Sequence, residues 1–568
     1  MATQATHLVT DVLVIGSGGA GMCAAIEASR AGASVLVADR SLIGRSGATV
    51  MAMMTVAVAV GEETPDHWTY HYNDTLTAGR GLCDPSLARL LCEEGPDMIR
   101  QMDAWGVGWA RRDGHIAQAH APGHDRPRCV YVDFLNTGPA VSKTLRTVLH
   151  KEKNVRRIGD LVVVDLVCGK GGVSGAVALE MSSGRPVTIA ANSTIVATGG
   201  LTRLYRRNSA SANMGGDGYA LALRAGARLI DMEFVQFFPI GHLAPRLIGL
   251  DPIMWDPFRY KLGGRLLNGN MEEFTSSYGS PEDGKYVITR DMATYAITQE
   301  VEAGRGSPHG GAYLSFMHLS EEQLKAAFGP VIEKLAANGI DLTKMPVEVA
   351  PIAHYHMGGI AVDTGMRTGV PGLLAAGEAV GGANGANRLS GNAITEALVF
   401  GRQAGRTAIA DLKSGDAAIA FDPRDAEAAL DLVLGSGPEP HAFNSAALIA
   451  KLQSLMWRDV GPFRTAAGLK RALDGIEDLQ RRLGDGPPGT PASFDLSRLD
   501  WFDLRNMLQV AQSVATAALS RTESRGAHQR DDYPGLIEDW TCNQIISLGD
   551  GRMSIERGPR IVAQEAAE

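Results

Sequence analysis

A group of glycines close to the N-terminus has the spacing of a turn that binds phosphate. Gly16, Gly18, Gly19 and Gly21 belong to the run Gly-Ser-Gly-Gly-Ala-Gly. In such a turn the first glycine permits a tight bend, the second lets the backbone approach a pyrophosphate, and the last lets a helix pack closely on a strand. Asp39 follows 23 residues after Gly16 and is placed to hydrogen bond to ribose hydroxyls. This spacing predicts a dinucleotide site.

The elements around this turn must hold it in place. Residues 11–15, DVLVI, have the pattern of a strand buried on both faces. A helix-like segment rich in small residues then ends at Gly32, and ASVLVADR supplies a second buried strand. Residues 11–40 thus predict a βαβ unit whose helix N-terminus offers N–H groups and a positive dipole to phosphates. A glycine-rich turn alone is weak evidence, and the whole unit still leaves FAD and NAD open.

Composition narrows the class of protein. The chain has 568 residues, 45% of them hydrophobic and 21% charged, which is typical of a globular protein with two or three domains. The net charge of -9 disfavours a nucleic-acid partner, because neutralising phosphates requires a basic surface. The longest apolar run, residues 48–60, is too short to span a bilayer, and the first nine residues lack the features of a signal peptide. We expect a cytoplasmic protein with no direct membrane insertion.

The cysteines indicate no metal centre. They form no C-x-x-C pair, which argues against a zinc site, an iron–sulfur cluster in this chain and a disulfide framework. We expect most of them to be small, buried apolar residues. The six are Cys23, Cys83, Cys92, Cys129, Cys168 and Cys542.

Four later segments resemble the flavoprotein subunits of succinate dehydrogenase and fumarate reductase, a family that also includes L-aspartate oxidase. The resemblance implies that the cofactor is FAD. It also implies an α/β protein with a Rossmann-like FAD-binding domain, an inserted α+β capping domain and a C-terminal helical domain. The segments are NSTIVATGG (192–200), GGDGYALALRAGARLIDMEFVQ (215–236), HYHMGGI with LLAAGEAVGGANGANRLSGNAITEALVFG (within 354–401) and ESRGAHQRDDYP (523–534).

The positions of these segments predict the domain boundaries. Residues 446–483 and 499–520 show apolar residues at three- and four-residue intervals, which is typical of helices, and the Gly- and Pro-rich linker GDGPPGTPAS separates them. We expect the FAD-binding domain at 1–238 and 350–415, the capping domain at 239–349, the helical domain at 416–540 and a C-terminal tail at 541–568.

The resemblance also implies which residues line the cofactor. The predicted strands TIVATGG and GLLAAGE would form walls of the site, and Glu378 would contact the ribityl chain or the ribose. Asp217 or its neighbouring amides would touch the flavin, with a simple N-cap role as the alternative. The full set is Gly16, Gly18, Gly19, Ala20, Gly21, Asp39, Arg40, Ser46, Gly47, Ala197, Thr198, Gly199, Asp217, Glu378, Arg388, Asn392, Ala393 and Ile394.

For catalysis, the resemblance implies hydride transfer between flavin and a carbon of a carboxylate-bearing substrate, while an arginine exchanges a proton with the adjacent carbon. The segment TRDMA resembles the family's arginine motif, so we expect Arg290 to be this proton donor or acceptor. Since the pKa of arginine exceeds about 12, it needs a relay. Asp256 and Arg259 have the family's three-residue spacing for that relay, with aspartate where glutamate is usual. A surface salt-bridged turn is the alternative.

The family binds the two ends of a dicarboxylic acid separately, and one end is preserved in this chain. His354 and Arg388 match the histidine and arginine that hold one carboxylate, where a guanidinium gives bidentate geometry. We expect His356 to be a packing residue.

The other end is not preserved. Phe238 stands where the family has a histidine in Q-x-H-P, and Trp255 stands where it has a threonine. We expect fumarate and succinate to be poor substrates, because a carboxylate stranded against apolar walls is costly. The predicted substrate keeps one carboxylate and carries an apolar or aromatic group against Phe238 and Trp255. His242 offers a partial replacement for the lost donor if its loop is shifted.

The flavin attachment also departs from the membrane-bound relatives. They link FAD covalently to a histidine in a segment like R-S-H-T-V, whereas this chain has Gly47 at that point. The nearest histidines are His67 and His71. We therefore expect non-covalent FAD, which in this family favours alkene reduction or the oxidation of an easier substrate.

Two other interpretations stay open. An adenylylsulfate reductase-like flavoprotein also shows an RSGA-like stretch, but His354, Arg290 and Arg388 have no obvious role in that chemistry. An L-aspartate oxidase-like enzyme would need the second carboxylate site. The resemblance leaves the partners open. The chain either passes electrons to an iron–sulfur or other electron-transfer subunit, which would hold it at the inner membrane, or works without such a subunit, alone or as a homo-oligomer.

Overall fold

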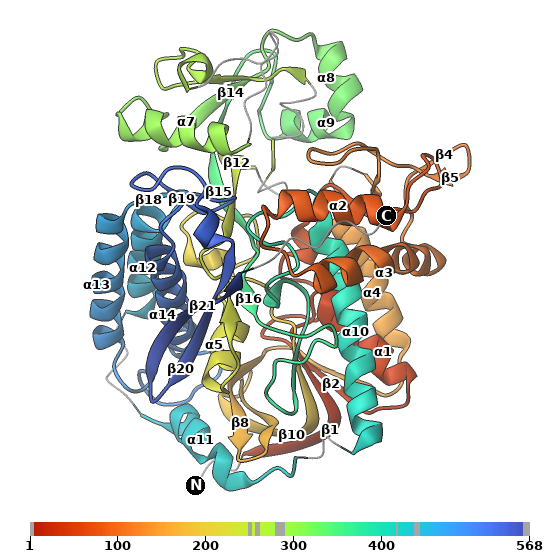
Figure 1. Ribbon diagram of the computed structural model, residues 1–568, viewed down its shortest axis with the longest axis vertical. Coiled ribbons are helices and arrows are strands. Elements are labelled where there is room, and N and C mark those ends of the chain that lie inside the picture. Colours follow the sequence, from red (N-terminus) through yellow and green to blue (C-terminus); the bar gives the residue numbers. More distant parts are fainter. Residues whose placement is uncertain are drawn as a thin grey trace. The chain divides into compact units, whose positions relative to one another are not determined.

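The computed structural model describes residues 5–133, 135–247, 253–255, 262–278, 290–415, 419–436 and 444–560. The chain divides into two compact units (Figure 1). The first unit contains residues 1–206, 210–235 and 355–568, and the second contains residues 207–209 and 236–354. Among the described helices, none has both the length and the apolar character that crossing a membrane requires.

A seven-stranded sheet forms the centre of the first unit, with the order β7-β2-β1-β10-β9-β8 and with β17 paired to β10. β1, β2, β7, β10 and β17 pair in parallel, whereas β9 is antiparallel to both β10 and β8. The strands are β1 (Thr6–Ile15), β2 (Val35–Ala38), β7 (Val155–Ile158), β8 (Leu161–Gly169), β9 (Gly172–Glu180), β10 (Arg185–Val196) and β17 (Leu373–Ala375).

The predicted βαβ unit is confirmed, with one difference at its start. β1 begins at Thr6 rather than Asp11, because the long β10 continues far enough for Thr6 to pair with Val187. α1 (Gly19–Arg30) joins β1 to β2 and packs beside α10 (Asn392–Ser414) (Figure 1). The small residues explain this close packing, since a Cβ on Gly405 would lie 2.6 Å from the Ala24 carbonyl oxygen.

Further helices and short strands complete this half of the first unit. The helices are α2 (Trp68–Ala78), α3 (Pro85–Ala104), α4 (Thr137–Lys151), α5 (Asp217–Arg224), α11 (Glu427–Leu434) and the 3-10 turn η5 (Gly377–Ala379). The short strand pairs are β3 (Val56–Ala57) with β6 (Cys129–Val130), and β4 (Arg111–Arg112) with β5 (His115–Ile116).

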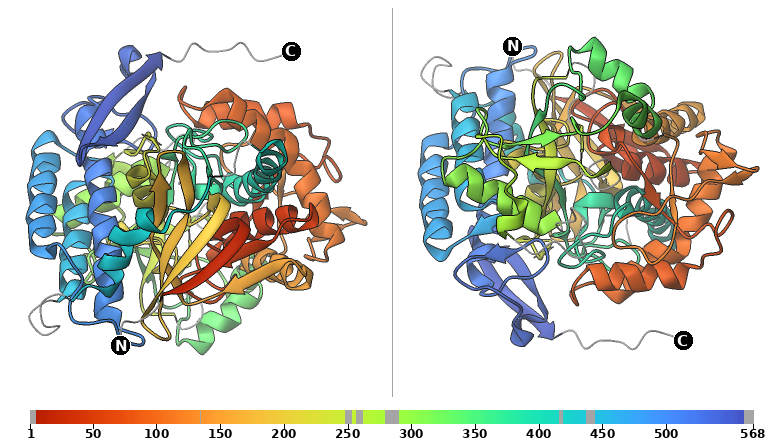
Figure 2. Two further views of the ribbon diagram at one scale, coloured as in Figure 1. Left: turned by 90° about the horizontal axis from the view of Figure 1, so that it is seen from below. Right: turned by 90° about the horizontal axis from the view of Figure 1, so that it is seen from above.

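The C-terminal part of the first unit is mainly helical, as predicted. The periodic segment 446–483 is two helices, because Gly461 and Pro462 interrupt it after α12. The helices α12 (Ser445–Asp459), α13 (Ala466–Leu483) and α14 (Leu496–Ser520) pack on one another (Figures 1 and 2), and β18 (Phe463–Arg464) pairs with β19 (Gln529–Arg530).

The chain end forms more structure than the expected tail. β20 (Cys542–Gly549) and β21 (Arg552–Arg560) form a hairpin, and β20 also pairs with β11 (Leu229–Ile230). β16 (Gly359–Ile360) completes this four-stranded sheet. The hairpin is therefore tied to a segment more than 300 residues earlier in the chain, which local sequence patterns cannot reveal.

The second unit has the predicted α+β composition. Its sheet has the order β12-β15-β14-β13. The elements are β12 (Val235–Ala244), β13 (Arg265–Leu267), β14 (Ala312–Ser315), β15 (Val347–His356), α7 (Arg290–Glu302), α8 (Glu321–Phe328) and α9 (Pro330–Ala337).

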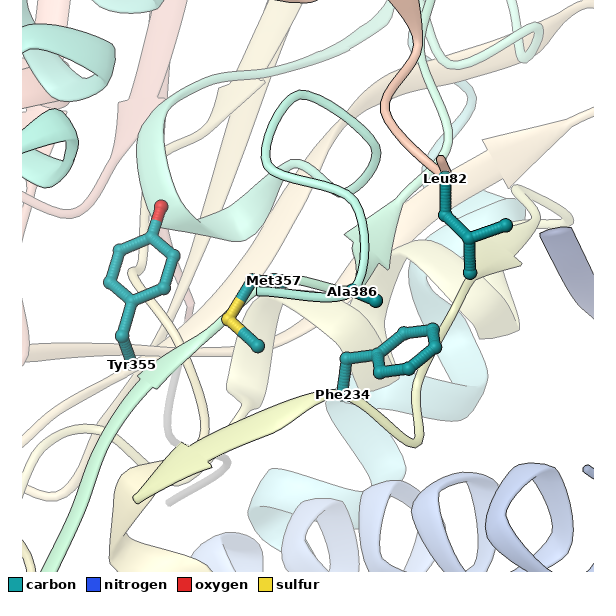
Figure 3. Close-up of a cluster of buried hydrophobic side chains, with 5 residues drawn as sticks. All are labelled: Leu82, Phe234, Tyr355, Met357 and Ala386. Atoms are coloured by element: carbon teal, nitrogen blue, oxygen red, sulfur yellow. The ribbon is translucent and has the colours of Figure 1, made fainter. Parts of the chain in front are cut away.

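A small apolar cluster in the first unit gathers residues from distant parts of the chain. Figure 3 shows Leu82, Phe234, Tyr355, Met357 and Ala386 together. The Met357 amide donates a hydrogen bond of 3.1 Å to the Phe234 carbonyl, so the segment that follows β11 is joined to the segment that follows β15.

The prediction for the cysteines is confirmed in its main point. All except Cys168 are buried. Burial raises the pKa of Cys23 and of Cys129 to about 12, so these thiols stay protonated and behave as small apolar groups.

Candidate active site

The glycine-rich turn has the geometry that a pyrophosphate needs. Gly16 has a φ of +100°, and a Cβ there would lie 2.5 Å from the Ala197 carbonyl oxygen. A Cβ on Gly21 would collide with the Gly16 carbonyl. Gly18 differs, because its Cβ would meet only the Thr49 hydroxyl at 3.7 Å. Gly16 and Gly21 are thus required by the fold, whereas Gly18 leaves room for a ligand to approach the backbone.

The start of α1 is open to an anion. Its N-cap is Gly18, which has no side chain to satisfy the first amides of the helix. The Gly19 amide donates to Thr49 Oγ1 at 3.0 Å. The sequence predicted no role for Thr49, because a threonine 30 residues from Gly19 has no local pattern that links the two.

The carboxylate of Asp39 is held firmly at the end of β2. One of its oxygens accepts hydrogen bonds from the Ser17 amide at 2.8 Å and from the Ser17 hydroxyl at 2.5 Å. The other accepts from the Ser41 amide at 2.8 Å. The Ser41 hydroxyl donates to that second oxygen as well, at 3.0 Å, and together these contacts orient the carboxylate.

Arg40 and Asp217, both expected at the cofactor, contact each other. Arg40 Nη1 lies 3.1 Å from Asp217 Oδ2, and its Nη2 lies 2.8 Å from Asp503 Oδ2 on α14. Gly216 is the N-cap of α5, with a φ of +86°, so Asp217 is not the helix cap. Burial raises the pKa of Asp217, which Arg40 opposes. The helical part of the chain therefore helps to orient both side chains.

The strand ends β10 and β17 lead to the residues expected as cofactor walls. Residues 197–199 follow β10, and the Thr198 hydroxyl is buried without a hydrogen-bond partner among the described residues. Glu378 Oε1 accepts a hydrogen bond of 3.2 Å from the His356 amide, and burial raises the pKa of Glu378 to about 8. An unsatisfied hydroxyl and a protonated carboxyl can both serve a polar ligand, so this wall fits a nucleotide cofactor.

Asn392, the first residue of α10, has a side chain that is hydrogen-bonded within the protein. Asn392 Oδ1 lies 2.8 Å from His71 Nε2, and Asn392 Nδ2 donates to Thr75 Oγ1 at 3.2 Å and Asn384 Oδ1 at 3.3 Å. The cap of this helix is Gly391, which again has no side chain. Contacts of residues 392–394 with a cofactor would therefore come from backbone amides.

The segment that lacks the histidine is held by hydroxyl groups. Ser46 Oγ lies 2.6 Å from Ser41 Oγ, and the Gly47 amide donates to Ser211 Oγ at 2.8 Å. His71, one of the two nearest histidines in the sequence, is fully buried, and burial lowers its pKa to about 3.

His354 and Phe238 are neighbours in the second unit. Their ring centroids are 5.3 Å apart in an edge-to-face arrangement. His354 Nδ1 lies 2.7 Å from Ser209 Oγ, and that hydroxyl donates to the Ala353 carbonyl. The contact between Nδ1 and Oγ, in which either atom can be the donor, fixes the orientation of the ring. Sequence reasoning missed Ser209, because it lies 145 residues from His354.

Trp255 is fully buried, and its polar atom is already used. Its indole N–H donates to His242 Nδ1 at 3.0 Å, and His242 Nε2 lies 2.5 Å from the Pro245 carbonyl oxygen. The Trp255 ring also packs on Phe316, with the two ring centroids 6.1 Å apart. Both nitrogens of His242 have partners in the second unit. His242 would therefore have to break two hydrogen bonds to replace the histidine that we expect the family to have at the position of Phe238.

The structure describes only some of the residues that we expect to transfer the proton. Arg290 is the first residue of α7. Asp256 and Arg259 lie outside the described residues, so the relay stays a prediction.

Arg388 belongs to the first unit and is mostly buried. Its guanidinium carbon lies 4.5 Å from the centroid of the Tyr355 ring. Since His354 belongs to the second unit, the binding of one carboxylate by both His354 and Arg388 also stays a prediction.

Comparison with known proteins decides the family. Residues 11–394 match the family model described as FAD binding domain, and residues 449–563 match the model described as Fumarate reductase flavoprotein C-term. The chain belongs to the succinate dehydrogenase and fumarate reductase flavoprotein family. It is an FAD-dependent oxidoreductase of the type that acts on CH–CH groups.

Relatives of this flavoprotein match over most of their length. The fumarate reductase flavoprotein subunit of Escherichia coli is 34% identical, covering 92% of this chain and 88% of the relative. L-aspartate oxidase of Streptomyces coelicolor is 32% identical, covering 96% and 92%. The solved structure of Mycobacterium smegmatis Sdh1 in complex with UQ1 has a TM-score of 0.88 at 34% identity, covering 99% and 96%. The expected fold class, family and cofactor are thus confirmed.

Proposed function

We propose that this flavoprotein transfers hydride between FAD and a C–C or C=C bond next to a carboxylate, and that its substrate is a monocarboxylate with an apolar or aromatic end. One observation carries the proposal: Phe238 packs on His354, the residue expected to bind the carboxylate. The second aromatic replacement, Trp255, supports it, because its N–H already donates to His242.

Each side chain that matches the family pattern has a distinct task in this proposal. His354 and Arg388 hold the one carboxylate, with the guanidinium supplying two parallel N–H donors. Arg290 exchanges a proton with the carbon adjacent to the one that takes part in hydride transfer, and Asp256 with Arg259 returns that proton to solvent. FAD supplies the hydride chemistry when it is bound.

The two aromatics explain why fumarate and succinate should be poor substrates. A second carboxylate against Phe238 and Trp255 would lose its hydration without gaining a donor. Such a loss costs several kcal/mol, and each 1.4 kcal/mol is about a tenfold change in kcat/KM. An alkyl or aryl group at the same place would instead gain from burial.

We also propose that FAD is held without a covalent bond. Gly47 offers no nucleophile, and the Nε2 atom of the buried His71 is engaged with Asn392. Acid precipitation that left the flavin on the protein would contradict this. The cofactor residues are those of the glycine turn with Asp39 and Arg40, Ser46 and Gly47, residues 197–199, Asp217, Glu378, Arg388 and residues 392–394.

Two other reactions of related flavoproteins fit the site less well. Oxidation of L-aspartate requires a second carboxylate site, which Phe238 and Trp255 replace. Reduction of adenylylsulfate gives no task to His354 or Arg388, whose side chains are suited to a carboxylate.

An electron-transfer partner is part of the proposal. The Escherichia coli relative is named as the flavoprotein subunit of a fumarate reductase, which indicates a multisubunit enzyme. We propose an iron–sulfur or similar subunit that passes electrons to or from FAD and that would hold this chain peripherally at a membrane from the cytoplasmic side. Co-purification from the native source checks this, and a homo-oligomer without other subunits would contradict it.

The substrate proposal can be tested by flavin reoxidation. The chemically reduced holoenzyme is mixed with fumarate and with a panel of 2-enoic acids that includes 2-hexenoate and cinnamate. We expect at least one monocarboxylate to reoxidise the flavin more than tenfold faster than fumarate does. Faster reoxidation by fumarate than by every monocarboxylate would overturn the proposal. The variant Phe238→His, which restores the family's donor, should shift the preference toward fumarate.

A further inference from the structure

The guanidinium of Arg388 lies on an aromatic ring. Its central carbon is 4.5 Å from the centroid of Tyr355, a distance at which the ring face attracts the cation and restrains its plane. Tyr355 directly follows His354 in β15. The ring of Tyr355 is therefore placed to control the orientation of the group that the proposed function assigns to carboxylate binding.

The Tyr355 ring is itself held from its far end. Its hydroxyl donates to Oε2 of Glu396 on α10, and Asn384 Nδ2 donates to the same oxygen at 2.7 Å. Burial beside Glu396 raises the pKa of Tyr355 well above its usual range, so the phenol stays a donor. Figure 3 shows the hydroxyl directed away from Met357 and Phe234. If the ring moved, the buried Glu396 carboxyl would lose one of its two hydrogen bonds.

The same network continues to a second helix. Asn392 Nδ2 donates to Asn384 Oδ1 at 3.3 Å, and His71 Nε2 lies 2.8 Å from Asn392 Oδ1. His71 is fully buried with a pKa of about 3, so the ring is neutral and its Nε2–H is the donor. A continuous set of hydrogen bonds thus connects the Tyr355 ring on β15 with α10 and α2.

We propose that Tyr355 and Glu396 are positioning residues that set the plane of the Arg388 guanidinium and so determine how tightly the enzyme holds the substrate's carboxylate. This inference rests on the proposed function, in which Arg388 binds that carboxylate. Bidentate pairing requires the guanidinium and carboxylate planes to match, so a freely rotating Arg388 would keep its charge but lose affinity.

The test compares two buried tyrosines in the holoenzyme. Tyr355→Phe keeps the ring but removes its hydrogen bond to Glu396. We expect the Kd of 3-phenylpropanoate, followed by flavin absorption, and the KM of the best 2-enoic acid to rise about 10-fold, while kcat changes less than about threefold. Tyr205→Phe is the matched control, because its buried hydroxyl donates to the Val460 carbonyl at 3.2 Å. It should leave both constants unchanged within about twofold.

A conservative variant separates positioning from general damage. Glu396→Gln keeps an oxygen acceptor for the Tyr355 hydroxyl and for Asn384, so its Kd should stay within about threefold of the wild type. Glu396→Ala removes that acceptor and should resemble Tyr355→Phe. Equal Kd values for Glu396→Gln and Glu396→Ala would contradict a positioning role.

Arg388→Lys distinguishes the failure of this inference from that of the proposed function. If Arg388→Lys leaves the Kd unchanged, or if the wild type does not bind 3-phenylpropanoate, the carboxylate role of Arg388 fails and the inference fails with it. If Arg388→Lys weakens binding but Tyr355→Phe behaves like Tyr205→Phe, only the inference is overturned.

Discussion

At the scale of single residues, the glycines of the nucleotide turn have different tasks. Gly16 and Gly21 face protein atoms, since an added Cβ would contact the Ala197 carbonyl in one case and collide with the Gly16 carbonyl in the other. Gly18 has an open side. The motif therefore combines two positions that the fold requires with one that leaves space beside the backbone.

This difference predicts opposite outcomes for two alanine variants. Gly18→Ala should fold with normal thermal stability but bind FAD at least about tenfold more weakly, because its Cβ would occupy the path of the pyrophosphate. Gly21→Ala should lower the stability of the apoprotein by about 1–3 kcal/mol through overpacking. FAD is removed with acid, and the refolded apoproteins are titrated by flavin fluorescence and unfolded by heat. Equal FAD affinity in wild type and Gly18→Ala would contradict the assignment.

At the scale of elements, Arg521 and Glu523, the first residue of the ESRGAH motif, brace the segment that precedes β12. Arg521 Nε lies 2.5 Å from Glu233 Oε1, and its Nη1 lies 3.0 Å from Glu523 Oε1. All three side chains are fully buried. The guanidinium also lies 5.0 Å from the ring centroid of Phe234. The first residue of this motif thus has a structural role, because Glu523 pairs with Arg521, and Arg521 connects the end of α14 to Glu233.

Removing one carboxylate from this network should be costly. Glu523→Gln leaves Arg521 and Arg525 with less compensating charge in a buried place, so we expect a loss of about 3 kcal/mol in stability. Glu93→Gln is the control, because the Arg89–Glu93 pair is exposed and should contribute less than about 1 kcal/mol. Thermal unfolding of the FAD-saturated variants measures the difference. A similar Tm for both variants would contradict the role given to Glu523.

At the scale of the whole molecule, buried ionisable groups link stability to pH. Burial raises the pKa of Glu378 to about 8 and that of Glu396 to about 7. It lowers the pKa of His71 and of His356 to about 3. The folded protein therefore keeps both imidazoles neutral near neutral pH, and its two carboxyls release their protons at a higher pH than they do in the unfolded chain.

These shifts predict a maximum of stability in the weakly acidic range. The two carboxyls contribute fully to the free energy of unfolding below about pH 4.3, which is their pKa in the unfolded chain. This contribution is lost as the pH rises through 7 to 8. The two histidines contribute fully to the free energy of unfolding above about pH 6.5, which is their pKa in the unfolded chain. Their contribution is lost as the pH falls toward 3. The apparent Tm should therefore fall between about pH 6.5 and 8.5. Glu396→Gln should flatten this fall, and a Tm that rises over the same interval would contradict the prediction.

The sequence by itself determined the βαβ unit, the FAD cofactor and the family, because these depend on short-range spacing and on motifs that occur in order along the chain. It also predicts that Phe238 and Trp255 depart from the family pattern. It did not reveal that Asp217 pairs with Arg40, that Ser209 orients His354, or that Tyr355 contacts Glu396 beneath Arg388. Only the tertiary structure decided these pairings, because each joins residues 41 or more positions apart. The packing of strands and helices decides which polar side chains contact one another. The spacing of residues along the chain does not predict that packing.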